Sequence, residues 1–392
     1  MRCGANASST RLCGSLFAAL GLAVTCWLLL ARSEDDGGTG TRRRLRCAGR
    51  FVPADVQPSP GQLVLVTGGA GFIGSHVVAA LLHHNFSVRV LDDLSTGNAS
   101  SLPAHPRLEL RVGDVGDAHT AASAAAGCDF VVHLAAVSRV LGSLSPDAAL
   151  ACARVNVMGT LSVLEAARAA RVRRFVYAGS STAYGGEAEE DESLRDLATQ
   201  AYGFEWTSSP LLPSNEGDLP KPTTPYAATK HAGEVLVSSY DATFGLHTAS
   251  LRLFMVYGDA MGGRSGASEP REGPRATVVG RFVAAAAAGA AARMSGDGSQ
   301  SRDLVHVADV ARAFALSLER PLPRRAVINI GSGARTSVAQ LAAMAGAVPP
   351  QRAPPRRLDI RATLADTCAA QRLLGWAPRV PLADGLAAMM PR

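Results

Sequence analysis

A tyrosine and a lysine stand four residues apart in the segment PYAATK, residues 225–230. On a helix this spacing places Tyr226 and Lys230 one turn apart on the same face. A neighbouring ammonium favours the phenolate, so the pair predicts a tyrosine whose pKa is lowered towards neutrality and that can move a proton. The chain has only two lysines, Lys221 and Lys230, among 39 basic side chains, which argues against a chance match. We assign no role to Lys221.

A serine pair precedes this segment in YAGSSTAYG, residues 177–185. Because an apolar run comes before it, the pair stands at the end of an expected strand. Ser180 or Ser181 can hydrogen-bond the substrate oxygen that Tyr226 deprotonates. A serine pair at a strand end is more often an ordinary turn, but its position ahead of the tyrosine and lysine favours a function.

A glycine-rich segment, TGGAGFIG at 67–74, follows an apolar run and opens a helical pattern. Gly68 permits the tight turn, Gly71 lets the backbone approach a pyrophosphate, and Gly74 lets the helix pack on the sheet. Asp92 ends the next apolar run, 18 residues after Gly74. There its carboxylate can accept both ribose hydroxyls and would repel a 2′-phosphate, so the pattern predicts NAD rather than NADP.

Alternating strands and helices place these residues. Strands are expected at 63–68, 87–93, 108–114, 128–136 and 173–180, with a helix at 74–84 and Ala-rich helices between the later strands. This alternation indicates an α/β fold with a Rossmann-type, doubly wound parallel sheet.

Composition excludes several classes of function. The net charge of +6 comes largely from the first 50 residues, and no basic stripe is interleaved with aromatic residues, so nucleic-acid binding is not expected. The seven cysteines form no CxxC pair and the nine histidines no HxH or HExxH cluster. We therefore expect neither a metal site nor a disulfide framework.

The N-terminal region has a composition of its own. Residues 12–31 carry no charge and are long enough to cross a bilayer as a helix. We expect a cytosolic tail at 1–11, a membrane anchor at 12–31 and a flexible stem at 32–61. The body would then be lumenal, as in a type II protein of the Golgi or endoplasmic reticulum. A cleaved signal peptide and an organellar transit peptide are the alternatives.

Two glycosylation sequons, NFS at 85–87 and NAS at 98–100, matter only if the body is lumenal. Their acceptor residues are Asn85 and Asn98.

Taken in order, the motifs of residues 62–390 resemble the extended short-chain dehydrogenase/reductase family, and within it the nucleotide-sugar epimerases. The resemblance rests on TGGAGFIGSH, LDDLSTGN, GDVGD, HLAAVS, NVMGT, GSSTAYG, PYAATK, LRLFMVYG, GDGSQSRDLVHVADVA and LADTCAAQRLLGWAP. It implies NAD as cofactor, a UDP-sugar as substrate and a homodimer formed through a helix bundle that includes the tyrosine–lysine helix.

The resemblance also implies roles for individual residues. Ser180, Tyr226 and Lys230 would be the catalytic set. NAD would contact Gly68, Gly71, Phe72, Ile73, Gly74, Asp92, Asp114, Val115, Leu134, Ala135, Ala136, Asn156, Tyr226 and Lys230. The sugar nucleotide would contact Ser138, Ser181, Arg264, Arg302, Arg356 and Asp359.

The implied reaction is inversion at C4 of the sugar through a 4-keto intermediate. Related 4,6-dehydratases and UDP-glucuronate decarboxylases carry acidic residues close to the serine, where this chain has Ser181 and Thr182. Both rival chemistries are therefore less favoured. Met255 stands where many relatives have a polar contact to the sugar, and Arg264 could meet a sugar carboxylate. Glucose, N-acetylglucosamine, glucuronate and xylose all remain open as the sugar.

The resemblance divides the body into a mainly NAD-binding domain at 62–255 and a mainly substrate-binding lobe at 256–392 with return strands. An insertion at 187–218 is either a lid, a partner surface or a tolerated surface loop. A catalytically inactive NAD-binding scaffold is the alternative from another class of function.

Overall fold

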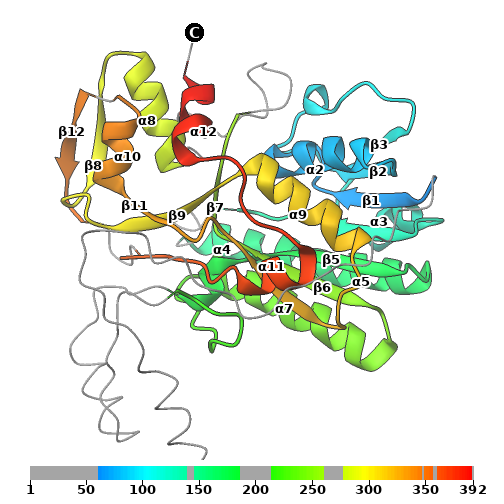
Figure 1. Cartoon of the computed structure of the whole chain (residues 1–392). Helices are drawn as coiled ribbons and strands as arrows, with labels where there is room; N and C mark the ends of the chain where they lie inside the picture. The colour runs from blue at the N-terminus through cyan, green and yellow to red at the C-terminus, as the bar shows by residue number, and fades with distance from the viewer. Residues whose placement is uncertain are drawn as a thin grey trace, which may run out of the picture. The chain divides into compact units, whose positions relative to one another are not determined.

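The structure is a computed structural model that describes residues 61–138, 145–185, 213–259, 277–346, 348–355 and 360–390. Seven parallel strands form the main sheet in the order β10-β6-β5-β4-β1-β2-β3 (Figure 1). Their bounds are β1 (Leu63–Thr67), β2 (Ser87–Asp92), β3 (Leu108–Val112), β4 (Phe130–His133), β5 (Arg174–Ser180), β6 (Thr248–Leu253) and β10 (Ala326–Ile330). The predicted Rossmann-type parallel sheet is confirmed, and every strand expected from an apolar run lies in it.

Helices cover both faces of this sheet and bury two separate apolar clusters. Val64 belongs to the cluster under α2, α9 and α11, whereas its neighbour Leu65 belongs to the cluster under α3, α5 and α7. This alternation follows from the two-residue period of a strand. The helices are α2 (Phe72–His83), α3 (Ala118–Ala125), α4 (Pro146–Ala153), α5 (Thr160–Ala169), α7 (Pro225–Phe244), α9 (Val307–Glu319) and α11 (Cys368–Leu374). Short helical turns lie at η1 (Ala99–Ser101), η3 (Arg154–Gly159, a π-helix) and η4 (Ser181–Tyr184).

The C-terminal part of the chain builds a second lobe and then returns to the main sheet. A third apolar cluster, around Tyr257, Phe282 and Leu386, forms the interior of this lobe. Its strands are β7 (Met255–Tyr257), β8 (Ala291–Ser295), β9 (Ser301–His306), β11 (Arg335–Ser337) and β12 (Val348–Ala353), and its helices are α8 (Val278–Ala287), α10 (Val338–Met344) and α12 (Leu382–Met389). Because α9, β10 and α11 pack with the main sheet, the lobe is tied to it at several points.

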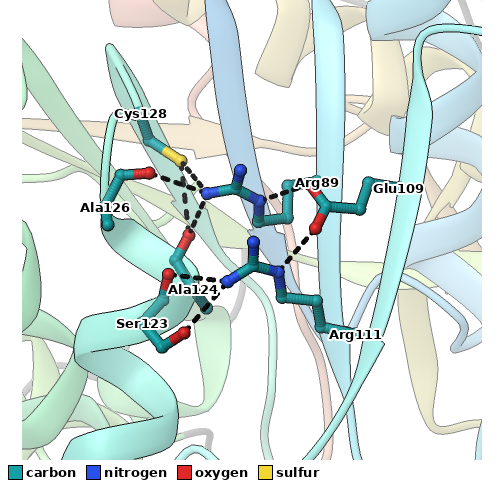
Figure 2. A network of polar contacts seen from close by, with 7 residues as sticks. All are labelled: Arg89, Glu109, Arg111, Ser123, Ala124, Ala126 and Cys128. Carbon is teal, nitrogen blue, oxygen red and sulfur yellow. Dashed lines mark hydrogen bonds and ion pairs between the residues drawn. The ribbon is translucent and has the colours of Figure 1, made fainter.

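A charged cluster marks the edge of the main sheet at β3 (Figure 2). Glu109 accepts hydrogen bonds from Arg89 at 2.7 Å and from Arg111 at 2.6 Å. Both guanidinium groups also donate to main-chain carbonyls in the last turn of α3, among them those of Ser123 and Ala124. Cations at a helix C-terminus are favourable, and charged side chains on an edge strand disfavour pairing with another sheet.

One described helical stretch, Pro146–Ala169, is long and apolar enough by length and composition to cross a membrane. It comprises α4, η3 and α5, and it packs beside α7 and α3. We therefore assign it to the folded body. Several predicted segments lie outside the described residues: the tail and anchor at 1–31, the stem as far as residue 60, and residues 187–212 of the insertion.

Candidate active site

The glycine-rich loop joins β1 to α2 at the carboxyl end of the sheet. Gly68 has φ +68°, and a Cβ there would lie 2.7 Å from the main-chain nitrogen of Ala135. A Cβ on Gly74 would lie 2.1 Å from the carbonyl oxygen of Gly68. Only glycine fits these two positions, one for its backbone conformation and both for the close approach. The turn and the tight helix packing predicted for Gly68 and Gly74 are thus present.

Helix α2 begins directly after this loop. Gly71 is its N-cap and supplies no side chain, and the helix begins with Phe72 and Ile73. The first N–H groups of a helix lack partners inside the helix, and together with the helix dipole they favour an anion. This end of α2 therefore fits the pyrophosphate of a dinucleotide.

Asp92 ends β2 beside the same loop. It is 7% exposed, and its carboxylate accepts hydrogen bonds from the main-chain nitrogens of Ala70 and Leu94, each at 2.9 Å. Burial raises the pKa of Asp92, while these two hydrogen bonds oppose the rise. The carboxylate thus holds the glycine loop in shape, and its remaining lone pairs fit the ribose hydroxyls predicted for it.

The opposite wall follows β3 and β4. Leu134, Ala135 and Ala136 leave β4 next to Gly68, as the contact with Ala135 indicates. Asp114 follows β3 and accepts a hydrogen bond from the main-chain nitrogen of Gly116 at 2.7 Å. The side chain of Val115 is buried in the cluster under α5, so only its main chain can face an adenine. These adenine and channel roles stay predictions.

The proposed catalytic residues come from the end of β5 and the start of α7. Thr224 caps α7 by accepting a hydrogen bond from the main-chain nitrogen of Ala227, and a proline occupies the first turn. This fixes the start of the helix, so Tyr226 and Lys230 follow one turn apart. Ser180 ends β5 and hydrogen-bonds Tyr226. The fold therefore brings Ser180 to Tyr226 across 46 residues of sequence, as expected.

The predicted lowering of the Tyr226 pKa is wrong for this structure. Burial raises the pKa of Tyr226 to about 12, although the hydrogen bond from Ser180 opposes the rise. Burial also lowers the pKa of Lys230 to about 7, and the charge of Glu234 opposes this change. The Lys230 side chain is 4% exposed. The sequence argument included the attraction between ammonium and phenolate but not the cost of burying either charge.

Asn156 lies behind the catalytic residues in the π-helix η3 and is fully buried. Its side chain accepts from the main-chain nitrogen of Val137 at 2.8 Å and donates to the Thr229 hydroxyl at 3.1 Å. Thr229 in turn donates to the carbonyl oxygen of Tyr226 at 2.9 Å. Asn156 thus joins the loop after β4 to the catalytic helix, which is the ordering role that the resemblance implies. π-helical turns are frequent at functional sites.

Sequence reasoning missed a buried ion pair one turn beyond Lys230. Glu234 bonds Arg252 of β6 at 2.6 and 3.0 Å, and neither residue is more than 6% exposed. The Tyr184 ring lies 4.7 Å from the Arg252 guanidinium, and its hydroxyl donates to Asn329 at 2.6 Å. The four-residue step from Lys230 to Glu234 was a visible signal. The partner Arg252 could be found only from the register of β5 and β6.

The predicted sugar-nucleotide residues are only partly described. Ser138 is exposed at the end of the loop after β4, Ser181 opens η4 beside Ser180, and Arg302 lies in β9 of the second lobe. The predictions for three further residues fall outside the described part of the chain: Arg264, Arg356 and Asp359.

The arrangement can carry out proton transfer beside a dinucleotide. The loop, the helix N-terminus and Asp92 fit NAD, and Tyr226 with Ser180 can exchange a proton with a substrate oxygen. Within the described residues, no group of three histidine, cysteine or acidic side chains could hold a metal ion.

Comparison with known proteins agrees with this site. The sequence pattern of the NAD dependent epimerase/dehydratase family matches residues 64–331. The UDP-glucose 4-epimerase of Mycolicibacterium smegmatis is 37% identical over 335 residues, which are 82% of this chain and 96% of that protein. The dTDP-glucose 4,6-dehydratase of Streptomyces griseus is 34% identical over 348 residues, 83% of this chain and 92% of that protein.

A solved structure gives the same result for the fold. The UDP-glucose 4-epimerase of Thermus thermophilus, crystallised as a complex with NAD, superposes with a TM-score of 0.67 and is 31% identical. The match covers 84% of this chain and 97% of that one. The predicted cofactor, NAD, is confirmed, and the chain belongs to the NAD dependent epimerase/dehydratase family.

Proposed function

We propose that this protein inverts C4 of a UDP-sugar through a transient 4-keto sugar. The observation that carries the proposal is the hydrogen bond between Ser180 and Tyr226, with Lys230 one helical turn further on, at the carboxyl end of the sheet that also carries the NAD loop. Ligands of open α/β sheets bind at this edge. The similarity to UDP-glucose 4-epimerases supports the same reaction.

Tyr226 is the acid–base group in this proposal. It takes the proton of the sugar's 4-hydroxyl and returns it when the opposite face of C4 has been reduced. Ser180, which hydrogen-bonds Tyr226, can also hydrogen-bond this sugar oxygen. Bound NAD supplies the hydride acceptor and donor and, when oxidised, a positive charge that favours the phenolate. Lys230, whose pKa is lowered to about 7, can add a second positive charge when protonated.

The dehydratase alternative requires an acid near the reacting carbons beyond C4. In this chain Ser180 is followed by Ser181 and Thr182, and Thr182 uses its hydroxyl to bond Ser180 at 2.9 Å. A serine and a threonine do not supply the carboxyl chemistry of a dehydratase or of a decarboxylase. The relative from Streptomyces griseus keeps the dehydratase alternative open for testing.

The identity of the sugar is tested with purified full-length protein and four UDP-sugars: UDP-glucose, UDP-N-acetylglucosamine, UDP-glucuronate and UDP-xylose. We expect NMR of at least one reaction to show inversion at C4, with the substrate and product reaching equilibrium from either side. A 4-keto-6-deoxy product would identify a dehydratase, and release of CO₂ would identify a decarboxylase. Conversion of none of the four would contradict the proposal.

Two tyrosine variants of α7 separate catalysis from folding. Tyr226→Phe should lower kcat by about 10²–10⁴-fold, because the proton-transfer group is lost. Tyr240→Phe is the matched control, since it removes a hydroxyl from the same helix that bonds Glu165 instead. If Tyr226→Phe keeps its cellular function, the protein is an NAD-binding scaffold.

We also propose that a second copy of the chain covers the outer face of α4, η3 and α7, which pack side by side. This face exposes three large apolar side chains: Leu150 at 71%, Met158 at 57% and Val235 at 53%. Exposed apolar patches of this kind mark protein interfaces. Sedimentation should therefore show a dimer for the wild type and a monomer for Leu150→Glu with Val235→Glu.

Finally, we propose that residues 12–31 anchor the protein and that the catalytic body is lumenal. The uncharged N-terminal stretch, which is long enough to cross a bilayer as a helix, supports this. Added protease should spare the body in intact microsomes and digest it after detergent treatment. Digestion in intact microsomes would contradict a lumenal body.

A further inference from the structure

His133 ends β4 beneath the active site, and the reaction proposed above does not use it. The ring is 1% exposed, and each of its nitrogens meets a threonine hydroxyl. Nδ1 lies 2.7 Å from Oγ1 of Thr67, the last residue of β1, directly before the glycine loop. Nε2 lies 2.9 Å from Oγ1 of Thr160, the first residue of α5.

The surrounding hydrogen bonds fix which nitrogen carries the proton. Thr160 donates its only hydroxyl hydrogen to the carbonyl oxygen of Asn156 at 2.7 Å, because a carbonyl can only accept. Thr160 must therefore accept from Nε2 of His133. Nδ1 of the neutral ring is then an acceptor, and it accepts from the Thr67 hydroxyl. Thr67 itself accepts from the main-chain nitrogen of Ala135 at 3.3 Å.

The result is one directed chain from the cofactor loop to the catalytic helix. It starts at the Ala135 N–H, passes through Thr67, His133 and Thr160, and ends at the Asn156 carbonyl. The Asn156 side chain then continues it through Thr229 to the carbonyl of Tyr226, as described above. Each hydroxyl in the chain accepts from the member before it and donates to the member after it, and Thr160 is also a hydrogen-bond partner of Tyr177. Loss of a member would therefore leave a buried polar group unsatisfied.

A second proton on His133 would sit on Nδ1 and would require the Thr67 hydroxyl to turn its hydrogen away and accept instead, which breaks the direction of the chain. Two aromatic rings, Phe175 and Tyr177, lie 5.9 Å from the imidazole, and the Lys230 ammonium lies above Tyr177 at 4.3 Å. Burial, with Lys230 adding a like charge, lowers the pKa of His133 to about 3.

We propose that His133 is a positioning residue of the reaction: a neutral imidazole in its Nε2–H tautomer that sets the cofactor loop against the catalytic helix. Because the ring cannot be bypassed in the chain, its loss should loosen the fit between NAD and Tyr226. The expected effect on kcat rests on the proposed function. The expected effect on NAD retention rests only on NAD being the cofactor.

Four variants test it in the full-length protein: His133→Gln, which keeps an uncharged donor and acceptor; His133→Phe, which keeps a ring without polar atoms; Thr160→Val; and Ser162→Ala. The last is the matched control for Thr160→Val. Ser162 donates to the carbonyl four residues earlier at 3.1 Å, as Thr160 does, but it is not a partner of His133. The measurements are NAD per chain after purification, kcat, and KM for the sugar nucleotide.

We expect His133→Phe and Thr160→Val to lose at least fivefold in retained NAD and tenfold in kcat, with KM changed less than threefold. His133→Gln should recover most of both losses, and Ser162→Ala should match the wild type. If Thr160→Val retains as much NAD as Ser162→Ala, the proposal is wrong, even where His133→Phe fails to fold. If the wild type converts no UDP-sugar, the proposed function is wrong instead. The NAD retained by Thr160→Val, compared with that retained by Ser162→Ala, would still decide the role of His133.

Discussion

His133 should make the protein sensitive to mild acid. The folded protein holds the ring neutral, with a pKa of about 3, whereas the unfolded chain protonates it near 6.5. Because the folded-state pKa is the lower one, the stability that the neutral ring contributes is fully present above pH 6.5. It is lost as the pH falls towards 3. With these two values, linkage gives a loss of about 2 kcal/mol between pH 7 and pH 5.

Urea unfolding of the wild type and of His133→Gln at both pH values measures this contribution, with fluorescence of the buried Trp376 as a probe. The wild type should lose about 2 kcal/mol more than the variant on going from pH 7 to pH 5. Lys230, and the other histidines whose pKa is lowered, titrate alike in both proteins and cancel in the difference: His76, His247 and His306. Equal losses, with unchanged slopes in urea, would refute a neutral buried ring.

Three further substitutions have expected outcomes. Gly74→Ala places a Cβ against the Gly68 carbonyl, so it should cost about 1–3 kcal/mol in thermal unfolding and reduce the NAD that copurifies. Arg252→Met removes both arginine hydrogen bonds from the buried Glu234 and should cost about 3–5 kcal/mol in urea unfolding, of which the double variant with Glu234→Leu should recover most. Glu109→Gln should cost no more than about 1 kcal/mol, since this carboxylate is half exposed. The arginine hydrogen bond lowers the pKa of Glu109 below its ordinary value of 4.5, so this cost should be present at pH 7, decrease as the pH falls below that ordinary value, and shrink in high salt.

The main sheet could be predicted from sequence because each of its strands is short, apolar and bounded by turn residues. The run LVLVT between Gly61 and the glycine loop has no competing interpretation, and β1 covers it from Leu63 to Thr67. In the second lobe the signals are weaker. There β12 pairs with β8 in parallel through a register shift, and β11 pairs with β9 antiparallel over three residues. Such pairings depend on contacts between distant segments, which no local pattern specifies.

The candidate site divides in the same way. Gly68 and Gly74 could be recognised because backbone conformation and close approach leave their mark on residue type. Arg252 could not be recognised, because nothing in the local sequence distinguishes it from other strand residues. Its role depends on the sheet register, which places it opposite Gly179, where the absence of a side chain leaves room for the Glu234 carboxylate. The pKa values of Tyr226 and Lys230 could not be predicted either, because they depend on how much water the finished fold excludes.

This exclusion of water also explains why the chain uses lysine at position 230. The residue is 4% exposed, its ammonium lies 4.3 Å from the centre of the Tyr177 ring, and the charge of Glu234 favours its protonated form. Arginine cannot lose its proton in a protein and presents five donors in a rigid fork, so at this position it would be a permanent and unsatisfied charge. Lysine is compact and can become neutral where its pKa is lowered to about 7. Arginine serves as the basic residue at almost every other position of the chain. At position 230, next to the Tyr177 ring and near His133, the basic side chain has to be one that can lose its proton near neutral pH.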